Sequence, residues 1–281
     1  MIRKKAFRFS FLLVLLLCIC LPFVYAMQYK GYSMSKLPSA YTLYIGNAMG
    51  LIWNYVQLLF PFLVIFPYSM SFYEESKEGT ILYIQARSGR TSYYISQLIT
   101  CFIGGFVIIC IPFLLNILLN SIIFPEIAND YISTYDRYTY NWSGGITGST
   151  TIFPVLSKGY MLKELYIHYP QLHNVLFALL SGVTAGIMAM LAYAFSIFIK
   201  KSRLFIFFLM YLFFQICSMA DSVLYDNWNE KTMYVCVDLV TYLSNGLLQV
   251  GRIYWLFYAI LLVVVLFAIK TIKGRIAEDE L

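Results

Sequence analysis

Hydrophobic residues in this sequence are gathered into long stretches that no charged residue interrupts. A helix needs about 20 apolar residues to cross a lipid bilayer, with a range of about 17 to 25. Six stretches reach that length, and the last two are the shortest. They cover residues 9–26, 50–72, 98–124, 172–199, 204–220 and 253–269. The pattern therefore predicts an all-α polytopic membrane protein with six transmembrane helices.

The composition supports a membrane protein and argues against a soluble one. Hydrophobic residues make up 60% of the 281 positions and charged residues only 12%, whereas about a quarter of a soluble domain is charged. The aromatic share of 19% is typical of chains whose Tyr and Trp side chains gather at the membrane interface. The net charge of +6 comes from basic residues that flank the apolar stretches, so it does not indicate a nucleic-acid partner.

Lys and Arg are shared unevenly between the segments that separate the six stretches. If the N-terminus is cytoplasmic, thirteen of them fall in cytoplasmic segments and seven in the outer segments, although the outer segments are longer. Basic residues accumulate in cytoplasmic loops, so both termini and residues 73–97 are predicted to be cytoplasmic. Residues 1–26 also resemble a signal peptide, since basic residues precede an apolar stretch that ends at Val24, Tyr25 and Ala26.

One outer segment is too long to be a simple connection. Residues 125–171 are rich in Tyr, Ser, Thr and Gly, and a loop of this length usually has structure of its own. We expect it to form a small extracellular cap between the third and fourth helices. No internal repeat and no Pro- or Gly-rich linker divides the chain, so residues 1–281 are predicted to form a single transmembrane domain.

The sequence lacks the motifs of catalysis, phosphate binding and metal binding. The six cysteines include no Cys-x-x-Cys pair, the two histidines lie five residues apart, and no Gly-x4-Gly-Lys-Ser/Thr motif occurs. We therefore expect no enzyme activity, no cofactor and no metal site in this chain.

Polar and small residues inside the apolar stretches indicate contacts between helices. Amide side chains there usually hydrogen-bond neighbouring helices, although neutral groups can also coordinate an ion. The four amides that stand out are Asn54, Gln57, Asn116 and Asn120. Closely spaced glycines let helices approach each other, either within one subunit or across a dimer interface. These glycines are Gly46 and Gly50, Gly104 and Gly105, and Gly182 and Gly186.

Residues 73–97 carry a dense cluster of charge between the second and third stretches. Acidic residues come early and basic residues late, an order that complements the dipole of a short helix. We expect such a helix along the inner membrane face, with a bend near its glycine; the alternative is an ordinary solvated turn. The candidate docking residues for a cytoplasmic partner are Glu74, Glu75, Lys77, Glu78, Gly79, Arg87 and Arg90.

Two short motifs in this segment resemble the cytoplasmic loop of ABC transporter permeases of the type-2 exporter class. The first is Glu-Ser-Lys-Glu-Gly-Thr at residues 75–80, and the second is Ser-Gly-Arg followed by Tyr94 at residues 88–94. In that class an acidic segment ending in Gly-Thr follows the second helix, and a Ser-Arg-like turn leads into the third. The motifs cover a short part of the chain, whereas the similar six-helix layout covers most of it.

The resemblance implies partners and a mechanism. Two permease subunits, identical or different, would pair in a bacterial plasma membrane, and each would bind one copy of a separate ABC ATPase through residues 73–97. Residues 1–8 would form an amphipathic elbow and residues 224–250 short re-entrant helices. Gln97 departs from the class, in which a basic residue is common near the start of the third helix. The long outer loop and the aromatic composition are typical of permeases that export antimicrobial peptides or give immunity to them.

Two other classes of protein remain as alternatives. A carrier or channel would work without an ATPase, but ion-coupled carriers usually hold a charged residue within the membrane, and the six stretches contain none. A membrane-embedded enzyme would need His, Asp or Glu clustered at the membrane surface, and no such cluster stands out. The sequence therefore favours an exporter permease.

Overall fold

The computed structural model describes most of the first half of the chain and selected parts of the second half. The described residues are 2–32, 37–41, 43–47, 51–68, 75, 77–126, 139–140, 146–147, 162, 165, 168–198, 205, 207–209, 211–213, 215–216, 219, 263, 266, 269–270 and 274.

The described chain is mostly helical, as the sequence predicts, with one short hairpin. Its elements are α1 (Ile2–Gln28), the 3-10 helix η2 (Ile45–Asn47), α2 (Leu51–Ile65), α4 (Thr80–Ser88), α5 (Arg90–Ile123), β1 (Thr139–Tyr140), β2 (Ile146–Thr147) and α9 (Pro170–Phe198). β1 and β2 pair antiparallel, with Thr139 opposite Thr147. The hairpin belongs to the expected cap at residues 125–171, most of which lies outside the described residues.

Three helices of the described chain are long and apolar enough to cross a membrane: Lys5–Gln28, Arg90–Ile123 and Pro170–Ile197. α2 has 15 residues, fewer than the roughly 20 that a spanning helix needs. The stretches at 204–220 and 253–269 are described only at scattered positions, all of them helical. The fold is thus compatible with a multi-pass membrane protein, and three of the six predicted helices have the length and composition of a span.

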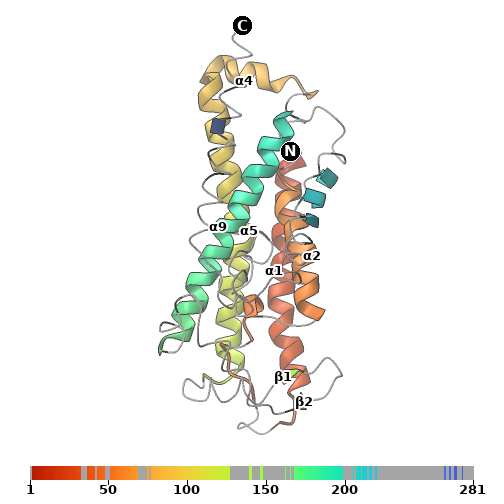
Figure 1. Cartoon of the computed structure of the whole chain (residues 1–281), viewed down its shortest axis with the longest axis vertical. Coiled ribbons are helices and arrows are strands. Elements are labelled where there is room, and N and C mark those ends of the chain that lie inside the picture. Colours follow the sequence, from red (N-terminus) through yellow and green to blue (C-terminus); the bar gives the residue numbers. More distant parts are fainter. Residues whose placement is uncertain are drawn as a thin grey trace, which may run out of the picture.

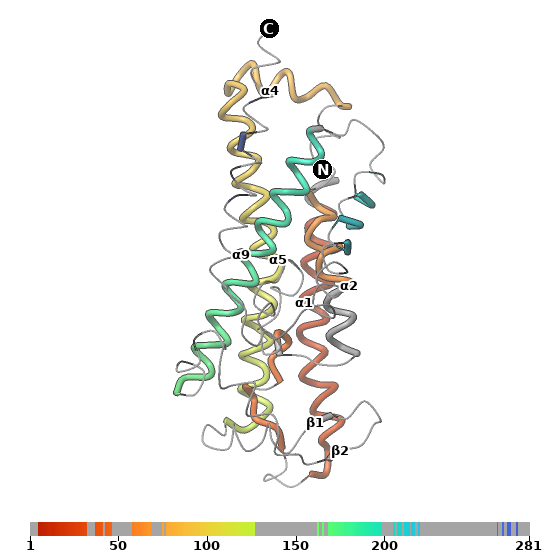
Figure 2. Tube along the Cα trace, viewed as in Figure 1, coloured from red at the N-terminus to blue at the C-terminus, as the bar shows by residue number. Residues whose placement is uncertain are grey.

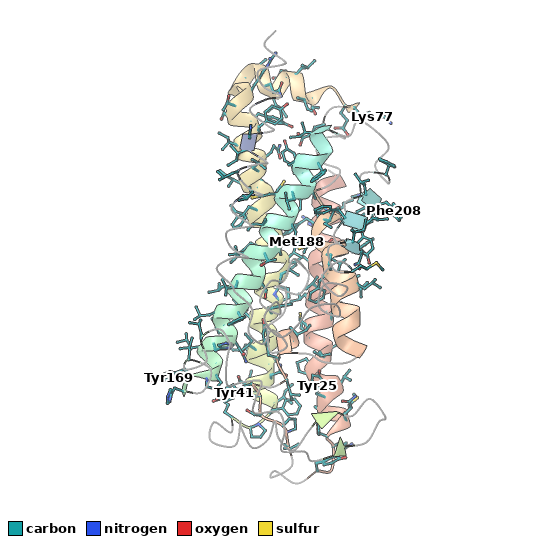
Figure 3. All side chains as sticks on the ribbon, viewed as in Figure 1. Tyr25, Tyr41, Lys77, Tyr169, Met188 and Phe208 are labelled. Atoms are coloured by element: carbon teal, nitrogen blue, oxygen red, sulfur yellow. The ribbon has the colours of Figure 1, made fainter. Side chains whose placement is uncertain are left out.

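Helix α5 is the centre of the bundle, because it packs along both α9 and α1. α1 and α5 run away from the end that carries α4, whereas α2 and α9 run back toward it (Figures 1 and 2). Figure 3 places Lys77 at this α4 end and Tyr41 at the other, which we call the Tyr41 end. The start of α1, α4 and the end of α9 share the α4 end, as expected for segments on one side of a membrane.

The described part of the fifth stretch packs antiparallel to α2. The ring of Phe207 lies 4.6 Å from that of Phe62 and 5.9 Å from that of Phe66. Four residues later, the Tyr211 hydroxyl donates to the carbonyl of Leu58 at 3.3 Å. Later residues of the fifth stretch therefore contact earlier residues of α2, so this segment runs toward the Tyr41 end.

Glycines allow α5 and α9 to approach closely. A Cβ atom at Gly105 would lie 2.7 Å from the carbonyl oxygen of Ala185, and one at Gly186 would lie 2.7 Å from the ring of Phe102. Gly182 likewise faces Phe106 on α5. Gly105, Gly182 and Gly186 therefore serve helix packing within one subunit, the first of the two roles that the sequence allowed. A dimer interface would have to use other surfaces.

Two helices begin earlier than their apolar stretches. α1 is continuous from Ile2 to Gln28, so the amphipathic elbow expected at residues 1–8 is not a separate element. α5 begins at Arg90 and not near residue 98, because Gly89 breaks the chain direction and the polar residues after it continue the helix. Pro112 lies inside α5 and Pro61 inside α2, and both helices run through their prolines.

A proline explains one contact between α1 and α5. Pro22 lies inside α1 and has no N–H, so the carbonyl of Cys18 lacks its usual helical donor. The side-chain amide of Asn116 donates to that carbonyl at 2.8 Å. Asn116 therefore hydrogen-bonds a neighbouring helix, as predicted from the sequence.

The connection between α1 and α2 turns back into the bundle. We call residues 37–41 and 43–47 the re-entrant segment; it ends in η2 and is largely buried. Tyr44 and Ile45 belong to the main hydrophobic core, where the ring of Tyr44 lies 5.7 Å from that of Phe113. The sequence alone predicts only an outer loop for residues 27–49, the segment that follows the first apolar stretch.

Candidate functional site

The charged segment at residues 73–97 is a helix followed by the start of a second helix. α4 (Thr80–Ser88) is preceded by Gly79 at φ 70° and followed by Gly89 at φ 80°, conformations that glycine adopts at little cost. This confirms a short helix beside a bend at Gly79. Arg87 lies in its last turn as expected, but no acidic residue lies in its first turn, so the predicted charge order is only half present. The alternative of a solvated turn is wrong, and residues 90–97 belong to α5.

One face of α4 is held against the bundle. Ile81 and Gln85 are its buried residues, and their four-residue spacing places them on one side of the helix. Ile81 joins the main hydrophobic core. The helix therefore lies across the α4 end of α5 (Figure 1).

Glu75 points inward and anchors this segment to α5. Its carboxylate accepts a hydrogen bond from the Tyr93 hydroxyl and contacts the Gln97 amide nitrogen at 3.4 Å. Its backbone carbonyl accepts from the Thr80 hydroxyl at 3.1 Å. Gln97, which departs from the class that this sequence resembles, thus supplies an amide donor to the acidic segment.

The anchor is continuous with an aromatic cluster. Tyr93 and Tyr94 are each 2% exposed, and their rings lie 5.3 Å apart at 70°. Tyr193, near the end of α9, is fully buried and lies beside Tyr93. A displacement of α4 would therefore reach both α5 and α9 through packed side chains.

The opposite side of α4 is exposed and mixes charged with large apolar side chains. Leu82 is 73% exposed, Tyr83 72% and Ile84 37%. Exposed charges flank them. We define the α4 outer face as Lys77, Glu78, Leu82, Tyr83, Ile84 and Arg87.

The predicted docking residues therefore fall into three groups. Lys77, Glu78 and Arg87 lie on the α4 outer face, and Gly79 forms the bend before it. Glu75 is turned toward the bundle, and Arg90, the first residue of α5, is half-buried. Glu74 lies outside the described residues. The predicted set omitted Leu82, Tyr83 and Ile84. An apolar run at residues 81–84 inside a charged segment could have indicated them in the sequence.

Titratable side chains in the rest of the described chain do not form a metal site. Among the described residues, no three of His, Cys, Asp and Glu are grouped closely enough to hold a metal ion. His173 is buried, and its ring stacks on Phe177 at 4.4 Å.

The described fold is largely helical and has three helices of spanning length, so it is compatible with a multi-pass membrane protein. No protein-family model, no curated protein and no solved structure matches this chain. A proposal for its function therefore depends on its own residues.

Proposed function

We propose that this chain is the membrane-spanning permease subunit of an ATP-driven ABC exporter in a bacterial plasma membrane. Six spans with both termini in the cytoplasm would place the α4 end inside the cell. A separate ABC ATPase would dock on the α4 outer face. The observation that carries the proposal is α4 itself, a short helix that is buried on one side and apolar but uncovered on the other.

The exposed side chains of α4 favour a protein partner. Leu82 and Tyr83 are each more than 70% exposed, at the end of the bundle where the sequence places charged residues. Keeping apolar area in water costs about 25 cal/mol per Å², and apolar side chains surrounded by charges are typical of an interaction surface. Lys77, Glu78 and Arg87 supply that polar rim with both signs of charge.

The anchor of Glu75 supports a coupling role for the segment. A partner that moves α4 also moves Glu75, which is hydrogen-bonded to Tyr93 on α5. Because Tyr93 packs beside Tyr193 of α9, the two longest described helices would respond together. ATP hydrolysis by the partner would supply the energy, and a second permease subunit, identical or different, would complete the pathway. An antimicrobial peptide is the substrate class that the resemblance favours.

The experiment is a purification of tagged protein from its native cells in mild detergent, with the co-purifying proteins identified. We expect an ABC ATPase in stoichiometric amount with the wild type and its loss with Tyr83→Asp. The matched control is Tyr169→Asp, because Tyr169 is 65% exposed at the Tyr41 end. An ATPase that stays bound to Tyr83→Asp would show that α4 is not the dock.

The second candidate function is a carrier or channel that needs no ATPase. Buried asparagines favour it, because neutral oxygens can coordinate an ion and the Oδ1 atom of the fully buried Asn120 has no donor among the described residues. Wild-type protein that purifies without an ATPase and conducts ions in ATP-free vesicles would establish this alternative.

A further inference from the structure

The re-entrant segment fills the interior of the bundle near the Tyr41 end. Ser39 is fully buried, Ala40 is 3% exposed, Tyr44 1% and Ile45 2%. Two of these residues, Tyr44 and Ile45, contact the same core as the spanning helices. A segment that links two helices thus occupies space between α1, α5 and α9.

Three asparagine side chains hold the backbone of this segment. Asn174 on α9 donates to the carbonyl of Tyr41 at 3.1 Å. On α5, Asn120 donates to the carbonyl of Leu43 at 3.1 Å. Deeper on the same helix, the side-chain oxygen of Asn116 accepts the N–H of Ile45 at 2.9 Å.

The depth of the contacts makes these hydrogen bonds necessary. Asn116 lies seven residues before the end of α5 at Ile123, which corresponds to about 10 Å along the helix. Phe113, which contacts Tyr44, lies about 15 Å from that end. Non-helical backbone at such depth is tolerated only where protein groups or water satisfy it, and here the asparagines do so.

Hydrogen bonds and core packing hold the segment, and one buried acceptor beside it lacks a donor. Among the described residues, the Oδ1 atom of Asn120 is buried without a donor. Near the surface the N–H of Ala40 donates to the carbonyl of Pro125 at 3.1 Å, and the Tyr41 side chain hydrogen-bonds Glu126. By contrast, α5 and α9 pack on each other through their glycines, so their contact does not depend on this segment.

We propose that the re-entrant segment is a releasable plug that closes the bundle at the Tyr41 end. The amides of Asn120 and Asn174 are its latch. When the plug leaves, the polar groups of Asn116 and Asn120 open to the outer solution and the space between α1, α5 and α9 becomes accessible. This device does not depend on which partner binds α4.

Two native cysteines on α1 provide a matched test. Cys18 is fully buried and lies near the Tyr44 hydroxyl under the plug. Cys20 is two residues away at nearly the same depth, but it is exposed on the outside of the bundle. Two single-thiol proteins are made, one that keeps only Cys18 and one that keeps only Cys20, and each is treated in vesicles with a membrane-impermeant maleimide.

The latch variants are Asn120→Leu and Asn174→Leu, which keep the size of the side chain but remove the amide. We expect each to raise the labelling rate of Cys18 by at least about tenfold, the change that corresponds to 1.4 kcal/mol, with no change at Cys20. Thr184→Val is the control, because the buried Thr184 hydroxyl donates to the carbonyl of Leu180 on its own helix. Unchanged labelling of Cys18 in folded latch variants would overturn the proposal.

A second measurement needs no variant. In hydrogen exchange of the wild type, the amide of Ile45 should exchange at least about tenfold faster than the amides of α5 around Asn116, because plug release exposes it without unfolding the helix. Exchange as slow as that of α5 would mean that the segment is a fixed part of the core.

Discussion

At the scale of single residues, the structure separates side chains that hold the protein together from those that meet a partner. The sequence grouped Glu75 and Glu78 as docking acids because both lie in one charged run. Glu75 and Tyr93 are 18 positions apart in the sequence. A local sequence pattern does not predict a contact over that separation. The sequence could therefore find the charged segment but could not tell which of its acids faces inward.

The two glutamates give the first prediction. Glu75→Ala should lower the free energy of unfolding by about 1–3 kcal/mol, because it leaves the buried Tyr93 hydroxyl without its acceptor. Thermal unfolding in detergent measures this loss. Glu75→Gln keeps an oxygen acceptor and should recover part of it, and the exposed Glu78→Ala should stay within about 0.5 kcal/mol of the wild type. Equal effects at both positions would contradict the inward orientation of Glu75.

Tyr41 gives a prediction about pH. Burial and then the nearby Glu126 carboxylate raise the pKa of the Tyr41 hydroxyl to about 12, above the ordinary value of about 10. The neutral hydroxyl is favoured in the folded state, so its contribution to stability is complete below about pH 10 and is lost as the pH rises toward about 12. The difference in absorbance at 295 nm between wild type and Tyr41→Phe should titrate near pH 12. A midpoint near pH 10 would contradict the burial of the Tyr41 hydroxyl beside Glu126.

At the scale of elements, hydrophobic patterning found the helices, and contacts distant in sequence decided where they begin and what lies between them. α5 starts at Arg90 because Gly89 ends α4 and turns the backbone. Its first turns are also held in place by the contacts of Tyr93 and Gln97 with Glu75. The re-entrant segment was missed for a similar reason. Its hydrogen bond from Ile45 to Asn116 joins residues 71 positions apart, and the loop sequence itself carries no sign of its burial.

The contact between α5 and α9 gives the third prediction. Gly105→Ala should destabilise the protein by about 1–3 kcal/mol, although alanine favours helix by about 1 kcal/mol over glycine, because the added Cβ would lie 2.7 Å from the Ala185 carbonyl. Gly274→Ala is the matched control, since Gly274 is helical and its Cβ would meet nothing within 4 Å. Thermal unfolding of both variants measures the difference. A neutral or stabilising Gly105→Ala would show that the two helices can separate without cost.

At the scale of the whole molecule, the bundle has two chemically different ends. Lys77 and the α4 outer face lie at one end, and Tyr25, Tyr41 and Tyr169 lie at the other (Figure 3). The count of Lys and Arg predicted that the start of α1, the α4 segment and the end of α9 share a side, and the directions of these described helices agree with that.

The two ends give the last prediction. In a protein without its native cysteines, Lys77→Cys should react with an impermeant maleimide only after the cells are opened, whereas Tyr169→Cys should react in intact cells. Both side chains are exposed, so access to each thiol depends on the side of the membrane and not on burial. Labelling of both positions from the same side would contradict a bundle that crosses the bilayer.

The length of α5 has a mechanical consequence. Its 34 residues make a rod of about 51 Å at 1.5 Å per residue, longer than the roughly 30 Å hydrocarbon layer. Tyr93 near one tip contacts Glu75, and Asn120 near the other tip contacts Leu43. A rigid rod tilted by a few degrees about its middle shifts both tips by an ångström or more in opposite directions. If α5 moves as one body, it acts as a lever whose two arms end at the α4 segment and at the plug, and strain applied at one end would reach the other.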